Sequence, residues 1–414
     1  MQNKTILIVS HGHPDINKGG GEIAAYNMFK EYLARGYDAY FLARTGELPH
    51  GGAAFSTRNS GREILFHTTM DDPFIFSNIK TRHLWKEFKE LVEKISPDVV
   101  HFHHYFLLGI EMLQVVKETL PQCKILMTLH EFLGICARNG LMITNGQNKL
   151  CYKAKHTDCA RCFPERSPGD FFLREQYIKN QFDLVDQFIS PSQFLKDRYV
   201  DWGLDEGKIE VIENGQPVVE TLPPAPLTEL NKRHRFAYFG QVNPYKGIDL
   251  ILEAVLAMPR KIRKEIVVDI HGANFDSQSG EYRDHVKAMF EELKGCVKFH
   301  GSYEPHEMST LLKDVDWVIV PSTWWENSPM VIQEAFNHGR PLIVSDIGGM
   351  AEKVAHDVNG LHFRTGKSAA LMETMLTVME NPKLWDKYYA GIKKPITSSE
   401  CVEQHLRFFC LSSL

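Results

Sequence analysis

The chain has 414 residues, of which 43% are hydrophobic and 24% are charged, and its formal net charge at pH 7 is -5. This length exceeds one ordinary hydrophobic core and predicts two domains. The negative charge argues against nucleic acid as a partner, because neutralising phosphates requires a local excess of lysine and arginine. No apolar stretch is long enough to predict a signal peptide or a membrane span, so we expect a cytoplasmic protein.

Short apolar runs alternate with helix-like segments along the chain, which is typical of parallel α/β sheets. In the first half, strands are predicted at 6–9, 39–42, 99–102, 125–129 and 187–190. In the second half, strands are predicted at 236–239, 266–270, 297–299, 317–320 and 341–344. The fold class is therefore predicted as α/β, with two doubly wound parallel-sheet domains.

The domain boundaries are predicted from composition. Residues 216–232 are rich in proline and lack periodicity, so they are expected to link a domain at 1–215 to a domain at 233–385. The segment 386–414 has a helical pattern, and we expect it to cross back onto the first domain.

Three consecutive glycines, Gly19, Gly20 and Gly21, open the predicted helix after the first strand. Such a loop offers backbone amides to an anion. The spacing differs from the dinucleotide fingerprint Gly-x-Gly-x-x-Gly. The alternative is a flexible loop that binds no ligand.

His130 follows the predicted strand 125–129, at the edge where doubly wound sheets place ligands. It is a candidate to hydrogen-bond a sugar hydroxyl or a phosphate, and the alternative is a structural histidine. Strand alternation places His101 and His103 on one face and His104 on the other, so these three are not predicted to bind a metal.

A polar insertion at about 131–168 carries Cys136, Cys151, Cys159 and Cys162. A Cys-x-x-Cys pair with two further cysteines matches the ligand count of a structural zinc ion, and His156 is a spare ligand candidate. The alternative is a set of reduced thiols. Four other cysteines are expected to pack in cores: Cys123, Cys296, Cys401 and Cys410.

A second glycine-bounded turn, from Gly240 to Gly247, joins the strand 236–239 to a predicted helix at 248–256. Gly240 lets the backbone approach a ligand closely, and Lys246 is able to reach a diphosphate as a point charge. The alternative is an ordinary turn with a surface lysine.

Two glutamates eight positions apart follow the strand 317–320. Ser328 is the predicted N-cap of the next helix, and proline follows it, so Glu326 lies in the loop and Glu334 about one and a half turns into the helix. The first helical amides, at Met330 and Val331, favour a phosphate.

Carboxylates accept hydrogen bonds, so the vicinal hydroxyls of a sugar are suitable partners for both glutamates. Together with the helix amides, the pair predicts a ligand of the form sugar, phosphate, sugar. The alternative is a solvated loop charge and a surface helix residue.

Taken together, these motifs resemble the retaining glycosyltransferases of family 4, whose GT-B architecture has two Rossmann-like domains facing a cleft. The resemblance covers nearly the whole chain and is closest to members with a cysteine-bearing insertion. It implies transfer of a sugar from a nucleotide-diphosphate sugar to a glycan or lipid-linked acceptor in bacterial surface polysaccharide assembly, without a catalytic metal. The motifs that carry it are 19–22, 128–131, 190–194, 211–215, 240–247, the glutamate pair and 346–349.

The resemblance also implies residue roles. Glu334 would hold the donor ribose, Glu326 a hydroxyl of the donor sugar and Lys246 the diphosphate. The amides of Gly20 and Gly21 would contact the same phosphates, and His130 would contact the donor sugar near its anomeric carbon.

One position departs from the family pattern. Where members usually have Gly-Arg, this chain has Gly240 followed by Gln241, so one charged phosphate contact, typically about 1 to 2 kcal/mol, is absent. This leaves open a non-catalytic subunit that binds sugar nucleotides. A sugar-nucleotide epimerase of the same fold is a second alternative, although such enzymes are not expected to have the Glu326 and Glu334 pair in this setting.

Two other patterns carry weaker alternatives. Asp71-Asp72 is compatible with a metal-dependent transferase, although the surrounding pattern is missing. Phe171, Phe172 and Arg174 are candidates to touch a membrane that carries the acceptor, at the inner face, and the alternative is an amphipathic core helix.

Overall fold

The computed structural model describes residues 4–16, 19–46, 53–78, 83–227 and 230–409. The chain forms two compact units, unit 1 with Met1–Pro217 and Ile396–Leu414, and unit 2 with Val218–Pro395. The boundaries between the units therefore lie after residue 217 and after residue 395. The sequence-based boundaries were the end of the first domain at 215 and the end of the second at 385.

Unit 1 is built on an eight-stranded sheet in the order β3-β4-β2-β1-β5-β6-β7-β8, in which only the β3–β4 pair is antiparallel. The central strand β1 is buried along nearly its whole length. The strands are β1 Thr5–Ser10, β2 Asp38–Arg44, β3 Phe55–Arg58, β4 Glu63–Phe66, β5 Val99–Phe102, β6 Lys124–Thr128, β7 Gln187–Ser190 and β8 Ile209–Val211.

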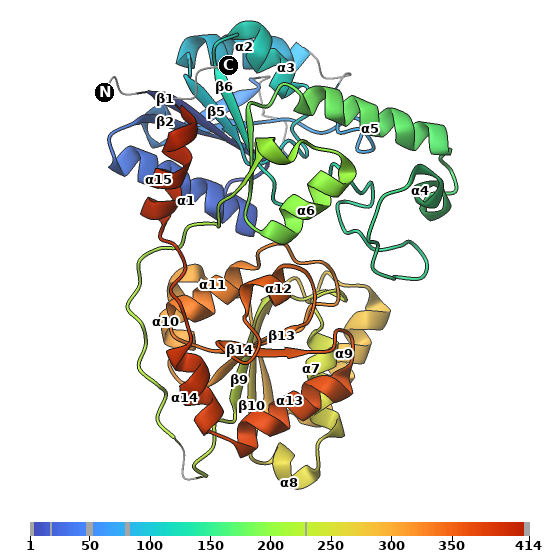
Figure 1. Cartoon of the computed structure of the whole chain (residues 1–414), viewed down its shortest axis with the longest axis vertical. Helices are drawn as coiled ribbons and strands as arrows, with labels where there is room; N and C mark the ends of the chain where they lie inside the picture. The colour runs from blue at the N-terminus through green and yellow to red at the C-terminus, as the bar shows by residue number, and fades with distance from the viewer. Residues whose placement is uncertain (1–3, 17–18, 47–52, 79–82, 228–229, 410–414) are drawn as a thin grey trace. The chain divides into compact units, whose positions relative to one another are not determined.

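The helices of unit 1 include one contributed by the C-terminal segment, α15, which packs beside α1 (Figure 1). Arg35, just after α1, donates to Glu403 at 2.6 Å and joins the two. The helices are α1 Gly20–Ala34, α2 His83–Ile95, α3 Met112–Thr119, α4 His156–Cys162, α5 Pro168–Phe182, α6 Gln193–Trp202 and α15 Ser398–Leu406.

Backbone hydrogen bonds hold the C-terminal segment where it returns to unit 1. The Gln216 amide donates to the Ile396 carbonyl, and the Ser398 amide donates to the Gln216 carbonyl. A side chain at Gly215 would lie only 2.6 Å from the Cα of Ser398, so this close approach requires glycine. Short helical turns complete the unit at Asn59–Gly61, Glu206–Lys208 and Arg407–Phe409.

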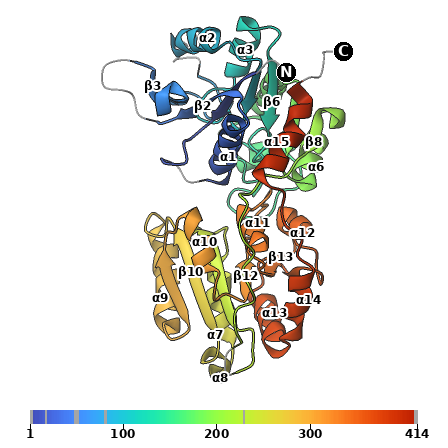
Figure 2. The ribbon, with the colours of Figure 1, turned by 90° about the vertical axis from the view of Figure 1, so that its left-hand side faces the viewer.

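Unit 2 has a six-stranded, wholly parallel sheet in the order β11-β10-β9-β12-β13-β14. Figure 2 shows α9 towards one end of this sheet and α12 and α13 towards the other. The strands are β9 Arg235–Gln241, β10 Val267–Ala273, β11 Val297–Gly301, β12 Trp317–Val320, β13 Leu342–Ser345 and β14 Gly360–Phe363.

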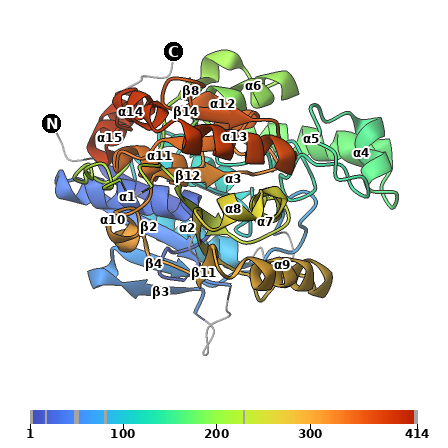
Figure 3. The same cartoon turned by 90° about the horizontal axis from the view of Figure 1, so that it is seen from below.

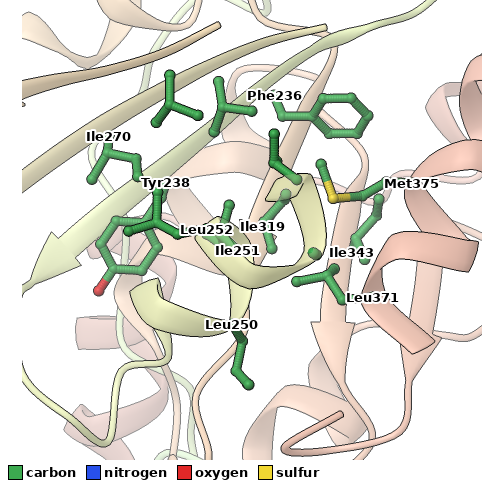
Figure 4. Packing of buried hydrophobic residues seen from close by; sticks show 14 of the residues in the cluster. Phe236, Tyr238, Leu250, Ile251, Leu252, Ile270, Ile319, Ile343, Leu371 and Met375 are labelled. Atoms are coloured by element: carbon green, nitrogen blue, oxygen red, sulfur yellow. The ribbon is translucent and has the colours of Figure 1, made fainter. Parts of the chain in front are cut away.

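The core of unit 2 forms where α7 packs on the sheet. Leu252 and Ile251 of α7 lie against Tyr238, Ile319 and their neighbours, all buried (Figure 4). The helices are α7 Ile248–Ala257, α8 Arg260–Arg263, α9 Gly280–Leu293, α10 Met308–Leu311, α11 Met330–Asn337, α12 Gly348–Lys353, α13 Ser368–Glu380 and α14 Lys383–Ala390, with a short turn at Pro305–Glu307.

All ten predicted strands are confirmed, within one to three residues at their ends. Four strands were missed: β3, β4, β8 and β14. Each is three or four residues long. β3, at the edge of its sheet, has mostly exposed side chains and no apolar run, whereas β4 is mostly buried and its apolar run of three residues, Ile64 to Phe66, was overlooked.

Phe171 and Arg174, considered as candidates for membrane contact, instead fit the alternative of an amphipathic core helix. Both side chains are buried, and the Arg174 guanidinium donates to the backbone carbonyls of Phe74, Leu133 and Gly134 at 2.5 to 2.8 Å. Of the three residues, only Phe172 is exposed. Within the described ranges, no helix has the length and apolarity needed to cross a bilayer.

Candidate functional site

The loop between β12 and α11 carries Glu326, whose carboxylate is almost completely buried. Its Oε1 atom accepts three hydrogen bonds, each of 2.7 Å, from Lys246 Nζ, Ser322 Oγ and Trp324 Nε1. Burial raises the pKa of Glu326, but the Lys246 charge and these three donors outweigh burial and hold the pKa below its ordinary value. Glu326 is therefore ionised, with one oxygen saturated by protein donors.

Lys246 is held in this position by the glycine that follows it. Gly247 has φ 73°, and a Cβ on it would lie 2.2 Å from the carbonyl oxygen of Pro321. Only glycine allows this close approach, which brings the turn after β9 against the loop after β12. The Lys246 ammonium also lies over the Trp324 ring, 5.4 Å from its centroid.

The predicted motif 346–349 packs behind the glutamate. The Gly349 amide donates to the backbone carbonyl of Glu326 at 2.7 Å, and a Cβ on Gly349 would collide with the carbonyl of Asn327. Asp346 accepts hydrogen bonds from the backbone and hydroxyl of Thr365. The contacts of Gly349 fix the backbone at Glu326 and Asn327.

The predicted capping of α11 by Ser328 is wrong. The helix begins at Met330, with Pro329 in extended conformation (ψ 118°) as its N-cap and no side-chain cap. Ser328 Oγ is instead buried and has no hydrogen-bond partner among the residues that the structure describes. A buried hydroxyl without a partner is unusual and lies beside the opening turn of the helix, at Met330 and Val331.

Glu334 lies on α11, half-buried, and its carboxylate makes no hydrogen bond or ion pair with another residue in the described ranges. Burial raises the pKa of this carboxyl to about 7. A shielded carboxylate without donors is a site that a ligand bearing hydroxyl groups would satisfy.

Gly240 and Gln241 end strand β9 in unit 2. Gly240 has φ 150°, a left-handed value that favours glycine, and the Tyr238 hydroxyl donates to the Gln241 carbonyl at 2.7 Å. The Gln241 side chain is exposed. The backbone is thus fixed and the side chain is available to a ligand.

In unit 1, α1 begins at Gly20, as predicted for the glycine loop. A Cβ on Gly21 would lie 3.4 Å from the ring of His130, so these two predicted residues are neighbours. The buried Glu22 carboxylate occupies the same helix end, 3.1 Å from His11 Nε2. Any phosphate bound at this glycine loop would have to tolerate that negative charge.

His130 is hydrogen-bonded to His103 at 3.0 Å, and the two rings stack. Burial lowers the pKa of His130 to about 3, so the imidazole is neutral at physiological pH. His101 and His103 share a face, as alternation predicted, while His104 contacts His11 instead.

The four cysteines of the insertion are free thiols of intermediate exposure. In the part of the chain that the structure describes, no three histidine, cysteine or acidic side chains are spaced as a metal site. Of the cysteines predicted to pack in cores, Cys123 and Cys401 are buried, Cys296 is half-buried and Cys410 lies outside the described residues.

Two residues that donate hydrogen bonds to Glu326, Ser322 and Trp324, escaped sequence analysis. His103 was considered there, but its hydrogen bond to His130 was not predicted. The adjacent tryptophans before the glutamate were a usable signal, because large aromatic side chains rarely occur in solvated loops without a packing or binding role.

Two family models match the chain. The model for Glycosyltransferase Family 4 matches residues 18–218, and the model for Glycosyl transferases group 1 matches residues 224–394. The chain belongs to the glycosyltransferases of family 4. The two models together span both halves of this family 4 protein.

Curated relatives agree with this assignment. The lipopolysaccharide 1,2-N-acetylglucosaminetransferase of Salmonella typhimurium is 29% identical over 212 residues, 48% of this chain and 55% of that protein. A 42.6 kDa protein of the cps region of Klebsiella pneumoniae is 22% identical over 302 residues, 73% of this chain and 69% of that protein. The match to the first of these spans about half of the relative's length.

Solved structures show the same GT-B fold. HepE of Anabaena in complex with UDP and glucose superposes with TM-score 0.67 at 16% identity, covering 98% of this chain and 99% of that chain. Sucrose-phosphate synthase from Thermosynechococcus elongatus gives TM-score 0.71 at 16% identity, with 98% of each chain covered. The apo lipopolysaccharide outer core galactosyltransferase WaaB gives TM-score 0.61 at 15% identity, covering 98% and 99%.

Proposed function

We propose that this protein is a retaining glycosyltransferase that moves a hexose from a nucleotide-diphosphate sugar to a glycan or lipid-linked acceptor in bacterial surface polysaccharide assembly. The observation that carries the proposal is the arrangement at the start of α11. There, an ionised Glu326 held by Lys246, a Ser328 hydroxyl without a partner and an unsatisfied Glu334 occur within one loop and helix.

In this proposal, Glu334 accepts hydrogen bonds from the ribose hydroxyls of the donor. The nucleotide supplies the donors that the carboxylate lacks in the free protein, so binding favours its ionised form. The Ser328 hydroxyl and the opening amides of α11 would contact the diphosphate.

Glu326 has a second role beside holding Lys246. Its Oε1 atom is already occupied by three donors, whereas Oε2 has no protein donor among the described residues. We assign Oε2 to a hydroxyl of the transferred sugar. Lys246 would stabilise the charge that develops on the leaving diphosphate, as a cation does in phosphoryl and glycosyl transfer generally.

The proposed transfer breaks the bond between the anomeric carbon and the diphosphate oxygen and forms a bond from the acceptor oxygen on the same face. The acceptor proton passes to the departing phosphate, so no protein nucleophile is required. The neutral imidazole of His130 would hydrogen-bond the sugar and is too weak a base to take that proton. Such an oxocarbenium-like path needs charge stabilisation at the diphosphate, which Lys246 and the opening amides of α11 would supply.

The test is a transfer assay with a panel of nucleotide-diphosphate sugars and a mixture of glycan and lipid-linked acceptors. UDP-sugars come first because HepE was crystallised with UDP and glucose. Transfer with the donor's anomeric configuration kept, measured by NMR of the product, supports the proposal. Inversion overturns the retaining assignment.

The same assay separates the two alternatives. Sugar-nucleotide conversion without an acceptor product identifies an epimerase. Binding without consumption of any donor identifies a non-catalytic subunit.

A further inference from the structure

The segment that follows β6 in unit 1 is folded without a core of its own. From residue 144 to residue 170 no side chain is buried. The segment contains α4, which projects beyond the sheet of unit 1 at the outer end of α5 (Figures 1 and 3). A seven-residue helix with no buried residue is not stable in isolation. Polar contacts near the surface hold it in the structure, such as His156 with Glu175 at 2.8 Å and Asn145 donating to the Cys162 carbonyl at 3.1 Å.

Four thiols are concentrated in and beside this segment. Cys159 and Cys162 occur on α4, three positions apart and hence on one side of the helix. Cys136 precedes the segment and Cys151 lies between. Each of Cys136, Cys151 and Cys159 is close enough to other members of the set for their charges to interact.

The sulfur of Cys136 accepts hydrogen bonds from the backbone N–H groups of Arg138 and Met142. The Cys151 thiol instead donates to the Lys153 carbonyl at 3.6 Å. Hydrogen bonds from amides to sulfur, as at Cys136, are the usual surroundings of a metal-bound thiolate.

We propose that Cys136, Cys151, Cys159 and Cys162 bind one structural zinc ion that fastens residues 131–168 to unit 1. Four thiolates complete the tetrahedral coordination that zinc adopts in structural sites, and binding releases the four thiol protons to solvent. Because the described residues contain no ready-made metal site, binding requires the sulfur atoms to move closer together around the ion.

The fastened segment forms one wall of a cavity of about 300 Å3 in unit 1. Tyr152 and His156 line it from the segment, and Arg198 and Trp202 line it from α6. Zinc would thus determine the shape of this cavity as well as the stability of the segment, independently of the donor site in unit 2.

The first experiment measures metal in the full chain, produced without a histidine tag in zinc-supplemented medium and purified under reducing conditions. Elemental analysis by mass spectrometry is expected to find one zinc per chain. The four thiols should react with a chromogenic thiol reagent only as zinc is released. A protein that retains no zinc, that contains iron instead, or that has these cysteines joined as disulfides overturns the proposal.

Substitutions test the ligand set. Cys159→Ser and Cys162→Ser are expected to lower the zinc content at least tenfold, whereas Cys296→Ser, a half-buried thiol of unit 2, should retain one zinc. If a variant fails to fold, limited proteolysis of the wild type with and without 1,10-phenanthroline gives the same answer. Chelation is expected to open new cleavage sites between residues 144 and 170, and an unchanged pattern contradicts the structural role.

Discussion

Lys246 Nζ lies 2.7 Å from Glu326 Oε1, although the two residues are 80 positions apart in the chain. The pair joins the turn after β9 to the loop after β12. It also orients one carboxylate oxygen towards protein donors and leaves the other without a donor among the described residues. The ion pair therefore joins the two loops, and in the proposed function it would present a cation and an acceptor to the donor substrate.

The first prediction concerns that cation. Lys246→Ala should lower kcat/KM for sugar transfer at least about 100-fold, as the loss of a charge-stabilising group at a transition state commonly does. Steady-state rates measure this. Lys287→Ala on α9, an exposed lysine, is the matched control and should keep wild-type rates. Wild-type activity in Lys246→Ala would exclude the proposed phosphate contact.

The second prediction concerns Ser328. Because its hydroxyl is buried without a partner, Ser328→Ala should leave the thermal unfolding midpoint unchanged or slightly raised, yet weaken donor binding about fivefold, the value of one neutral hydrogen bond. Ser322→Ala removes a hydrogen bond to Glu326 and should lower the midpoint instead. Equal donor affinity in wild type and Ser328→Ala would show that the hydroxyl contacts no ligand.

The third prediction concerns the close approach at Gly247. A Cβ there would meet the Pro321 carbonyl at 2.2 Å in a left-handed conformation, so Gly247→Ala should destabilise unit 2 by at least about 2 kcal/mol. Gly280→Ala has open space around its Cβ and should not destabilise the protein. Chemical denaturation of both variants measures this, and equal stability would mean that the two loops are not held as described.

The fourth prediction is a gain of affinity at Gln241. An arginine at this exposed position, at the end of β9, would restore a charged phosphate contact of about 1 to 2 kcal/mol, which is roughly a 5- to 30-fold lower Kd for the donor. Gln241→Ala, which adds no charge, should bind donor within about threefold of wild type. Calorimetric titration compares the three proteins. No gain with arginine would place the diphosphate away from β9.

The fold was largely predictable because buried parallel strands are continuous apolar runs, such as 6–9 and 317–320. Short outer strands such as β3 and β8 escaped because half-exposed strands carry no such run. The candidate glutamates and Lys246 were identified from the sequence. Their hydrogen bond was not, because local patterns carry no information on contacts between distant loops.

The start of α11 shows a different limit. Serine followed by proline is a common helix opening, and it predicted a cap at Ser328. In the structure Pro329 stays extended and the helix begins one residue later. Two contacts fix the backbone before the helix: the Gly349 amide donates a hydrogen bond to the Glu326 carbonyl, and Gly349 packs closely against Asn327. Such tertiary contacts override a local preference.

The fifth prediction concerns the pH dependence of stability that the Glu334 carboxyl produces. Burial raises its pKa to about 7 in the folded state, so the folded protein binds a proton that the unfolded chain releases above its ordinary pKa near 4.5. Stability should therefore fall as pH rises from about 4.5 to 7 and then level off. Glu334→Gln removes this pH-dependent component. Unfolding curves at pH 5 and pH 8 should show that the free energy of unfolding of the variant, relative to wild type, is higher at pH 8 than at pH 5.

The most direct test of the donor site is calorimetric titration of wild type and Glu334→Gln with the nucleotide sugar identified by the transfer assay, at pH 6 and pH 8. If the ionised carboxylate holds the ribose, wild-type affinity should rise about tenfold between these values, because the free group titrates near pH 7. The variant should bind more weakly and without this rise. Equal affinities with the same pH dependence in both proteins would contradict the assignment.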